Sequence, residues 1–129
     1  MNLVVDASAI AALLVSREEG VRVAERLAGR ELFAPQLLIP EVVSTLRGWV
    51  LGRHLDPARA EGAIDDFRAL DITVVDMFPL VDDAWALRER LTAHDAMYVA
   101  LARHLRCPLL TLDTKLAAAL PSDVEAIGG

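Results

Sequence analysis

Short apolar runs rich in β-branched residues alternate with longer segments rich in alanine and leucine along the chain. A short apolar run bounded by turn residues is typical of a buried strand, whereas apolar residues three or four positions apart indicate a helix. Alternation of the two predicts an α/β fold. The predicted strands cover residues 3–5, 32–34, 72–75, 109–111 and 124–127, and the predicted helices cover 7–15, 18–28, 36–53, 57–70, 79–91, 93–106 and 113–120.

The length and composition of the chain predict one compact unit. It has 129 residues, of which 54% are hydrophobic, and this is enough to fill the core of a single domain over residues 1–129. The single cysteine, Cys107, cannot form an internal disulfide, which suits a reducing cytoplasm. No signal peptide and no membrane span are predicted, so we expect a cytoplasmic protein.

The formal net charge is −6, so the field of the whole molecule does not attract nucleic acid. This argues against a protein that binds nucleic acid through a simple basic patch. It does not argue against a metal-dependent nuclease, because bound cations reverse the local potential.

Four acidic residues stand where the predicted elements change: Asp6, Glu41, Asp95 and Asp113. In a parallel sheet, ligands bind beyond the carboxyl ends of the strands. Asp6 and Asp113 follow strands, and Glu41 and Asp95 lie early in helices that begin at the same edge, so all four fall on one rim. Their lateral spacing depends on the strand order, which the pattern alone does not fix. Carboxylates ~5 Å apart repel by about 3 kcal/mol per pair, and Mg²⁺ or Mn²⁺ would relieve this repulsion.

Each carboxylate also has a purely structural explanation. Asp6 and Asp113 are suited to cap the helices that follow them. Asp95 stands three residues after Thr92, as in a capping box, and Glu41 could be an ordinary exposed helix residue. Capping and metal binding are compatible, so the combination of four residues is more informative than any one of them.

Four segments in this order resemble the motifs of the PIN domain, and within it those of the ribonuclease toxins of VapBC-type toxin–antitoxin pairs. The segments are residues 4–9, 35–46, 92–102 and 108–113, which together extend over most of the chain. The resemblance implies that Asp6, Glu41, Asp95 and Asp113 are catalytic residues and metal ligands, and that Ser8 and Thr111 support them.

The resemblance also implies a three-layer α/β/α fold, with a five-stranded parallel sheet in the order 3-2-1-4-5 and about seven helices. It implies Mg²⁺- or Mn²⁺-dependent cleavage of RNA that leaves 5′-phosphate and 3′-hydroxyl ends and so inhibits translation and growth. A cognate VapB-type antitoxin would neutralise the protein, which would form a homodimer and a heterotetramer or larger assembly with that antitoxin. Two positions depart from the family pattern: Ser44 stands where asparagine is frequent, and His94 where tyrosine is common.

Several other residues have both a functional and a structural interpretation. Arg17, Arg47 and Arg88 are candidates to bind RNA phosphates, although any of them could be ordinary surface charge. Trp49 and Trp85 lie on apolar stripes and are expected in the core, but a partly exposed Trp49 could line an antitoxin groove.

Three further expectations concern basic residues and histidines. His94 is expected to be an incidental, partly exposed side chain. Arg103 and Arg106 are expected to interact with the C-terminal dipole of their helix. His54 and His104 lack the spacing of zinc ligands to each other and to Cys107.

Other families with acidic sites fit less well. A receiver domain needs adjacent acids after the first strand, and a haloacid-type phosphatase needs Asp-x-Asp, but Asp6 is followed by Ala7 and Ser8. A catalytically inactive PIN-like module that binds RNA or protein remains the alternative to the nuclease.

Overall fold

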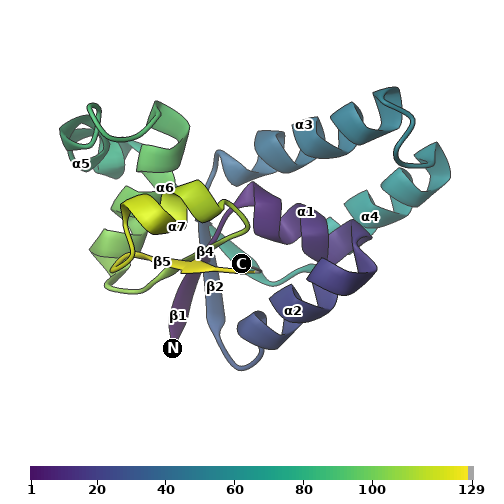
Figure 1. Ribbon diagram of the computed structural model, residues 1–129, viewed down its shortest axis with the longest axis horizontal. Helices are drawn as coiled ribbons and strands as arrows, with labels where there is room; N and C mark the ends of the chain where they lie inside the picture. Colours follow the sequence, from purple (N-terminus) through teal and green to yellow (C-terminus); the bar gives the residue numbers. More distant parts are fainter. Residues whose placement is uncertain (128–129) are drawn as a thin grey trace.

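A five-stranded parallel sheet forms the centre of the molecule, and its strand order is β3-β2-β1-β4-β5, as the resemblance implied (Figure 1). The computed structural model describes residues 1–127. The strands are β1 (Asn2–Val5), β2 (Glu31–Pro35), β3 (Ile72–Val75), β4 (Leu109–Thr111) and β5 (Val124–Ala126). The predicted single unit also included residues 128–129, which lie outside the described range.

Helices cover both faces of the sheet, so that α1 to α4 lie on one side and α5 to α7 on the other (Figure 1). The prediction of about seven helices in an α/β/α arrangement is therefore confirmed. They are α1 (Ala7–Val15), α2 (Arg17–Leu27), α3 (Leu38–Leu51), α4 (Pro57–Ala69), α5 (Val81–Ala86), α6 (Ala93–Leu105) and α7 (Thr114–Ala119), with a short 3₁₀ turn, η1 (Phe78–Leu80), before α5.

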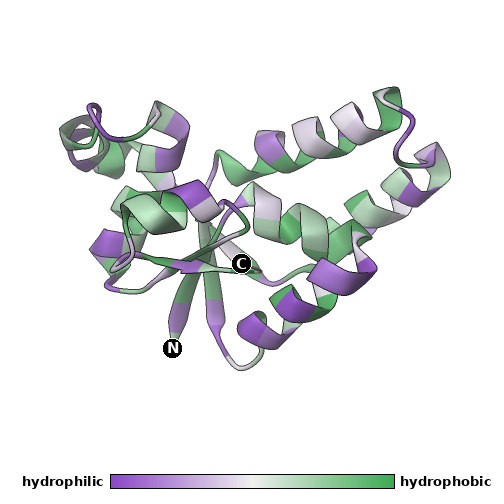
Figure 2. Ribbon diagram, viewed as in Figure 1, coloured by the Kyte–Doolittle hydropathy of each residue, from purple (hydrophilic) through white to green (hydrophobic). Residues whose placement is uncertain are grey.

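Helices α1 and α6 are the most buried helices. Helix α1 packs against α2, α3 and α4, and it is hydrophobic over most of its length, whereas α2 carries a hydrophilic outer face (Figure 2). Helix α6 contacts β1, β2 and β4 on the other side of the sheet. The N-terminal ends of these two helices lie at the carboxyl edge of the sheet, where they position Asp6 and Asp95. Across residues 1–127, every helix is too short or too polar to span a membrane.

Two predictions about the segment 79–91 are wrong. The helix there is shorter than predicted, and Trp85 does not lie in the core. Helix α5 ends at Ala86, and the amides of Leu87 and Arg88 bond three residues back to Ala84 and Trp85. Ala84 is buried, and Trp85, one residue or about 100° further round the helix, is 66% exposed. Trp49 in α3 is half-buried against the core.

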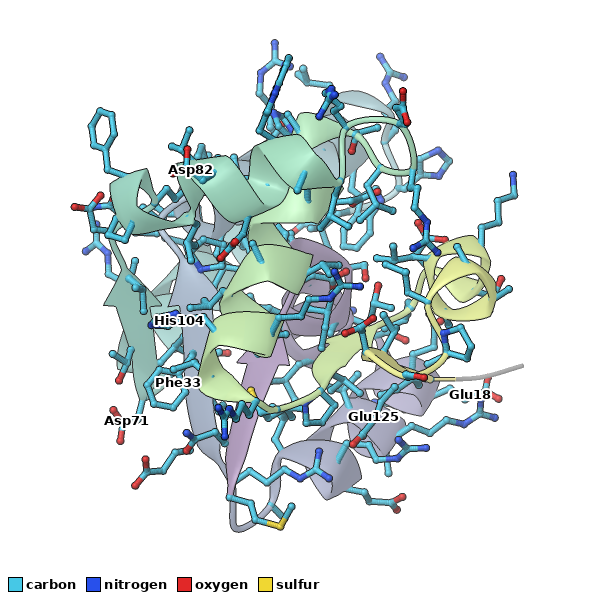
Figure 3. All side chains as sticks on the ribbon, turned by 90° about the vertical axis from the view of Figure 1, so that its left-hand side faces the viewer. Glu18, Phe33, Asp71, Asp82, His104 and Glu125 are labelled. Atoms are coloured by element: carbon cyan, nitrogen blue, oxygen red, sulfur yellow. The ribbon has the colours of Figure 1, made fainter. Side chains whose placement is uncertain are left out.

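Ion pairs fasten the C-terminal strand to distant parts of the chain. Both oxygens of Glu125 in β5 accept hydrogen bonds from Arg30, and Arg26 of α2 donates to one of them; Glu125 is labelled in Figure 3. Partial burial alone would raise the pKa of Glu125, but the two arginines outweigh it and lower that pKa. Arg103 lies in the last turn of α6, as expected, and it also forms a two-pronged ion pair with Asp123.

The close approach of α1 and α2 depends on Gly20. A Cβ on this residue would lie 2.9 Å from the carbonyl oxygen of Ala12. We expect Gly20→Ala to lower the free energy of unfolding by about 1 kcal/mol or more, because the clash is with backbone that cannot rotate away. Denaturant unfolding measures this.

Gly62 is the matched control, since a Cβ there meets nothing within 4 Å in the interior of α4. Gly62→Ala should raise stability by about 0.5–1 kcal/mol through helix propensity. Equal stabilisation by both substitutions would contradict the packing described for Gly20.

Candidate active site

Asp6 is the most firmly held of the predicted site residues. It follows β1 and caps α1, since its Oδ1 accepts hydrogen bonds from the Ala9 amide at 3.0 Å and from Ser8 Oγ at 2.6 Å. Its Oδ2 accepts a short hydrogen bond from Thr111 Oγ1. Both oxygens are therefore fixed, one by donors from the first turn of α1 and the other by a donor at the end of β4.

Hydroxyl groups connect the ends of β1 and β4. Thr111 is fully buried, and its Oγ1 also accepts a hydrogen bond from the Asp113 amide at 3.0 Å. Ser8 Oγ accepts one from the Leu112 amide, also at 3.0 Å. Because β1 and β4 are adjacent at the point where strand order reverses, this network holds Asp6 and Asp113 at the same end of the sheet.

Asp113 is exposed and caps α7. Its Oδ1 accepts hydrogen bonds from the amides of Lys115 at 2.9 Å and Leu116 at 3.1 Å. Since these bonds use Oδ1, the second carboxylate oxygen is directed to neither amide and is available to a ligand at the rim.

Glu41 and Asp95 begin two helices on opposite faces of the sheet. Glu41 lies in the first turn of α3, and Asp95 lies in the first turn of α6, where Thr92 Oγ1 accepts a hydrogen bond from its amide. Tyr98 of α6 donates from its hydroxyl to Glu41 Oε1 at 2.6 Å, and His94 Nδ1 lies 3.3 Å from Glu41 Oε2. His94 is 69% exposed, in line with the expectation of an exposed side chain, but its contact with Glu41 was not predicted.

Tyr98 was not among the site residues expected from the sequence. The available signal was its position three residues after Asp95, which places both on one face of α6. Its partner Glu41 is 57 positions away, and no local pattern identifies such a contact.

The carboxylates influence one another electrostatically. Burial raises the pKa of Asp6, hydrogen bonds from Ser8, Thr111 and the Ala9 amide oppose this, and the charge of Asp95 adds to the rise. Burial also raises the pKa of Asp95, and the negative charges of Asp113 and Glu41 raise it further, against weaker opposing effects of Thr92 and His94. Asp95 thus interacts electrostatically with each of the other three carboxylates, Asp6, Glu41 and Asp113.

These residues do not form a closed coordination shell. Within residues 1–127, no three His, Cys, Asp or Glu side chains are grouped closely enough to hold a metal ion by themselves. The donor chemistry nevertheless fits Mg²⁺, which keeps several waters and needs only one or two carboxylates. An open rim on which Asp6 and Asp95 have raised pKa values is compatible with such a partly hydrated cation.

The remaining predicted residues lie apart from the carboxylates or have no contact with them. Arg17 and Arg47 are exposed on α2 and α3. Arg88 stacks on Trp85, with its Cζ 4.8 Å from the ring centroid, beside a hollow of about 420 Å³ that Thr92 and Ala93 also line. Trp49 lines a separate hollow of about 300 Å³.

Comparisons with known proteins agree with the motif analysis. The family described as PIN domain matches residues 3–119. Ribonuclease VapC1 of Mycobacterium tuberculosis is 37% identical over 131 residues, which cover 96% of each chain. The structure of PAE2754 from Pyrobaculum aerophilum has a TM-score of 0.72 at 26% identity, covering 96% of this chain and 83% of that one. A toxin–antitoxin complex from Klebsiella pneumoniae contains a chain with the same fold, at a TM-score of 0.64, 19% identity and 96% coverage of both chains.

Mutual repulsion at the rim should be measurable as lost stability. We expect Asp95→Asn to raise Tm by a few degrees at neutral pH in the presence of a chelator. The substitution removes the charge that Asp113 and Glu41 repel, and it leaves the Thr92 cap intact because that cap uses the backbone amide.

Asp66→Asn is the control, since Asp66 is exposed on α4 and its replacement should leave Tm nearly unchanged. A decrease in Tm for Asp95→Asn, or shifts of equal size in both variants, would show that the rim carboxylates do not repel one another.

Proposed function

The chain belongs to the PIN domain family, and we propose that it is an endoribonuclease toxin of the VapC type that depends on a divalent cation. The observation that carries this proposal is the electrostatic coupling of Asp6, Asp95, Asp113 and Glu41 at the carboxyl edge of the sheet. Such a concentration of negative charge destabilises the folded protein, and it is useful where a cation binds and acts on phosphate.

Mg²⁺ or Mn²⁺ is the proposed cofactor, and Asp6, Glu41, Asp95 and Asp113 are its proposed ligands. Hard carboxylate oxygens suit both ions. A bound ion of this kind would polarise the scissile phosphate and lower the pKa of the water that attacks it.

The protein's own contribution is to hold the acidic groups in place and to guide the substrate. Ser8 and Thr111 fix both oxygens of Asp6, so this carboxylate is already oriented before substrate arrives. Arg17, Arg47 and Arg88 are the proposed contacts for RNA phosphates. With a net charge of −6, RNA binding would depend on such local contacts and on the cation.

A VapB-type antitoxin is the proposed partner. A related fold occurs in a toxin–antitoxin complex, and the hollow beside Trp49, which Val15 and Leu55 line together with Ser16, Glu19 and His54, offers a mixed apolar and polar surface for a segment of such a partner. We further propose that the protein acts in the cytoplasm as a homodimer, that its cleavage of RNA inhibits translation and growth, and that a heterotetramer or larger complex with the antitoxin is the inactive form.

The alternative of an inactive PIN-like module is less well supported. A module that only binds RNA or protein has no need for four interacting carboxylates, and their repulsion would favour replacement of at least one of them. This chain keeps all four, with raised pKa values for Asp6 and Asp95.

Replacement of Asp6 tests the proposed activity. Asp6→Asn keeps an oxygen that can accept the Ala9 and Ser8 hydrogen bonds but removes the negative charge. We expect kcat for cleavage of a fluorogenic RNA with Mn²⁺ to fall by a factor of about 100 or more, and growth inhibition on expression in bacteria to disappear.

Asp66→Asn, which removes a distant exposed carboxylate, should cleave RNA as the unaltered protein does. Circular dichroism establishes that the Asp6 variant is folded. Undiminished cleavage by folded Asp6→Asn would rule out the proposed active site.

A further inference from the structure

We infer that Tyr98 is a positioning residue that orients the carboxylate of Glu41 for the cation. This inference rests on the proposed function, because it assigns Tyr98 a role only if Glu41 is a ligand. It concerns how the site is assembled from two helices, α3 and α6, that lie on opposite faces of the sheet.

The contact has the geometry of a strong hydrogen bond. Tyr98 is 3% exposed, and its hydroxyl lies 2.6 Å from Glu41 Oε1. This is the distance expected when a hydroxyl donates to a charged carboxylate. Because the ring is enclosed by the core, the hydroxyl has little freedom to move away from Glu41.

Glu41 needs such a partner more than Asp6 or Asp113 does. Asp6 and Asp113 are short side chains that cap helices through backbone amides. Glu41 has a longer, more flexible side chain, and no amide among the described residues donates to its carboxylate. Tyr98 therefore removes rotamer freedom that a metal ligand would otherwise lose on binding.

His94 contacts the other carboxylate oxygen of Glu41 but cannot replace Tyr98. The His94 side chain is 69% exposed, so water can take its place at Oε2. Tyr98 is enclosed, so removal of its hydroxyl would leave Oε1 without its fixed donor. Tyr98 also shares one face of α6 with Asp95, so it holds Glu41 in a fixed relation to a second proposed ligand.

The test removes one oxygen atom. In Tyr98→Phe the ring that fills the core is retained, and the affinity for Mn²⁺ is measured by calorimetry in the full-length protein. Loss of a hydrogen bond that orients a metal ligand should weaken Mn²⁺ binding about 10-fold. With subsaturating Mn²⁺ and saturating RNA, kcat should fall by a similar factor, while KM for RNA should stay within about 2-fold because Tyr98 is buried away from the substrate.

Two further variants separate positioning from general stability. Thr45→Val removes a hydroxyl that donates to the backbone carbonyl of Glu41 rather than to its carboxylate, and should leave Mn²⁺ affinity unchanged. Tyr98→Phe added to Glu41→Gln should not weaken Mn²⁺ binding further, since Tyr98 acts through the Glu41 charge.

The outcomes distinguish this inference from the proposed function. Wild-type protein that binds Mn²⁺ but cleaves no RNA would refute the nuclease, while the Mn²⁺ affinities would still decide the role of Tyr98. Equal Mn²⁺ affinity in wild type and Tyr98→Phe would overturn the inference and leave the nuclease standing. Absence of Mn²⁺ binding by the wild type would also overturn it. So would a loss of Mn²⁺ affinity on Tyr98→Phe that is as large in the Glu41→Gln variant as in the wild type.

Discussion

Repulsion between carboxylates at one edge of a rigid sheet is the constraint around which this molecule is organised. Two unit charges 4 Å apart at an effective dielectric of 20 cost about 4 kcal/mol, a large fraction of the stability of a small domain. Hydrogen bonds to Asp6 and the exposure of Asp113 limit this cost, and the raised pKa of Asp95 reflects burial and the repulsion from Asp113 and Glu41. We propose that a divalent cation relieves the repulsion that remains.

The fold explains why these charges are close although they are distant in sequence. Strands β1 and β4 are neighbours where the strand order reverses, and helices α3 and α6 begin at the same edge. The hydroxyls of Ser8 and Thr111 join the two strand ends, and Tyr98 joins α6 to Glu41 of α3. Asp6 and Glu41 are thus held by donors that are buried or partly buried, and Asp113 is held by the amides at the start of α7.

Much of this arrangement could be predicted from particular residues. Prolines and β-branched runs delimited the strands, and the position of Asp6 directly after the first of them placed it at the carboxyl edge. The strand order came from the resemblance, because periodicity does not reveal which strands are neighbours. Trp85 was misplaced because it lies about 100° round the helix from the buried Ala84, on the exposed face of α5. The contacts of Tyr98 and His94 with Glu41 were missed because they join the starts of two helices on opposite faces of the sheet, which no local sequence pattern reveals.

The central claim is that a divalent cation relieves the repulsion among the four carboxylates. Thermal unfolding of the wild-type protein with increasing Mn²⁺ at constant ionic strength tests it most directly. The account predicts a progressive rise in stability, of about 2.7 kcal/mol at a hundredfold excess over Kd, and no such rise when Asp6, Glu41, Asp95 and Asp113 are all replaced by their amides. A wild-type Tm that does not respond to Mn²⁺, or an equal response in the fully amidated protein, would contradict it.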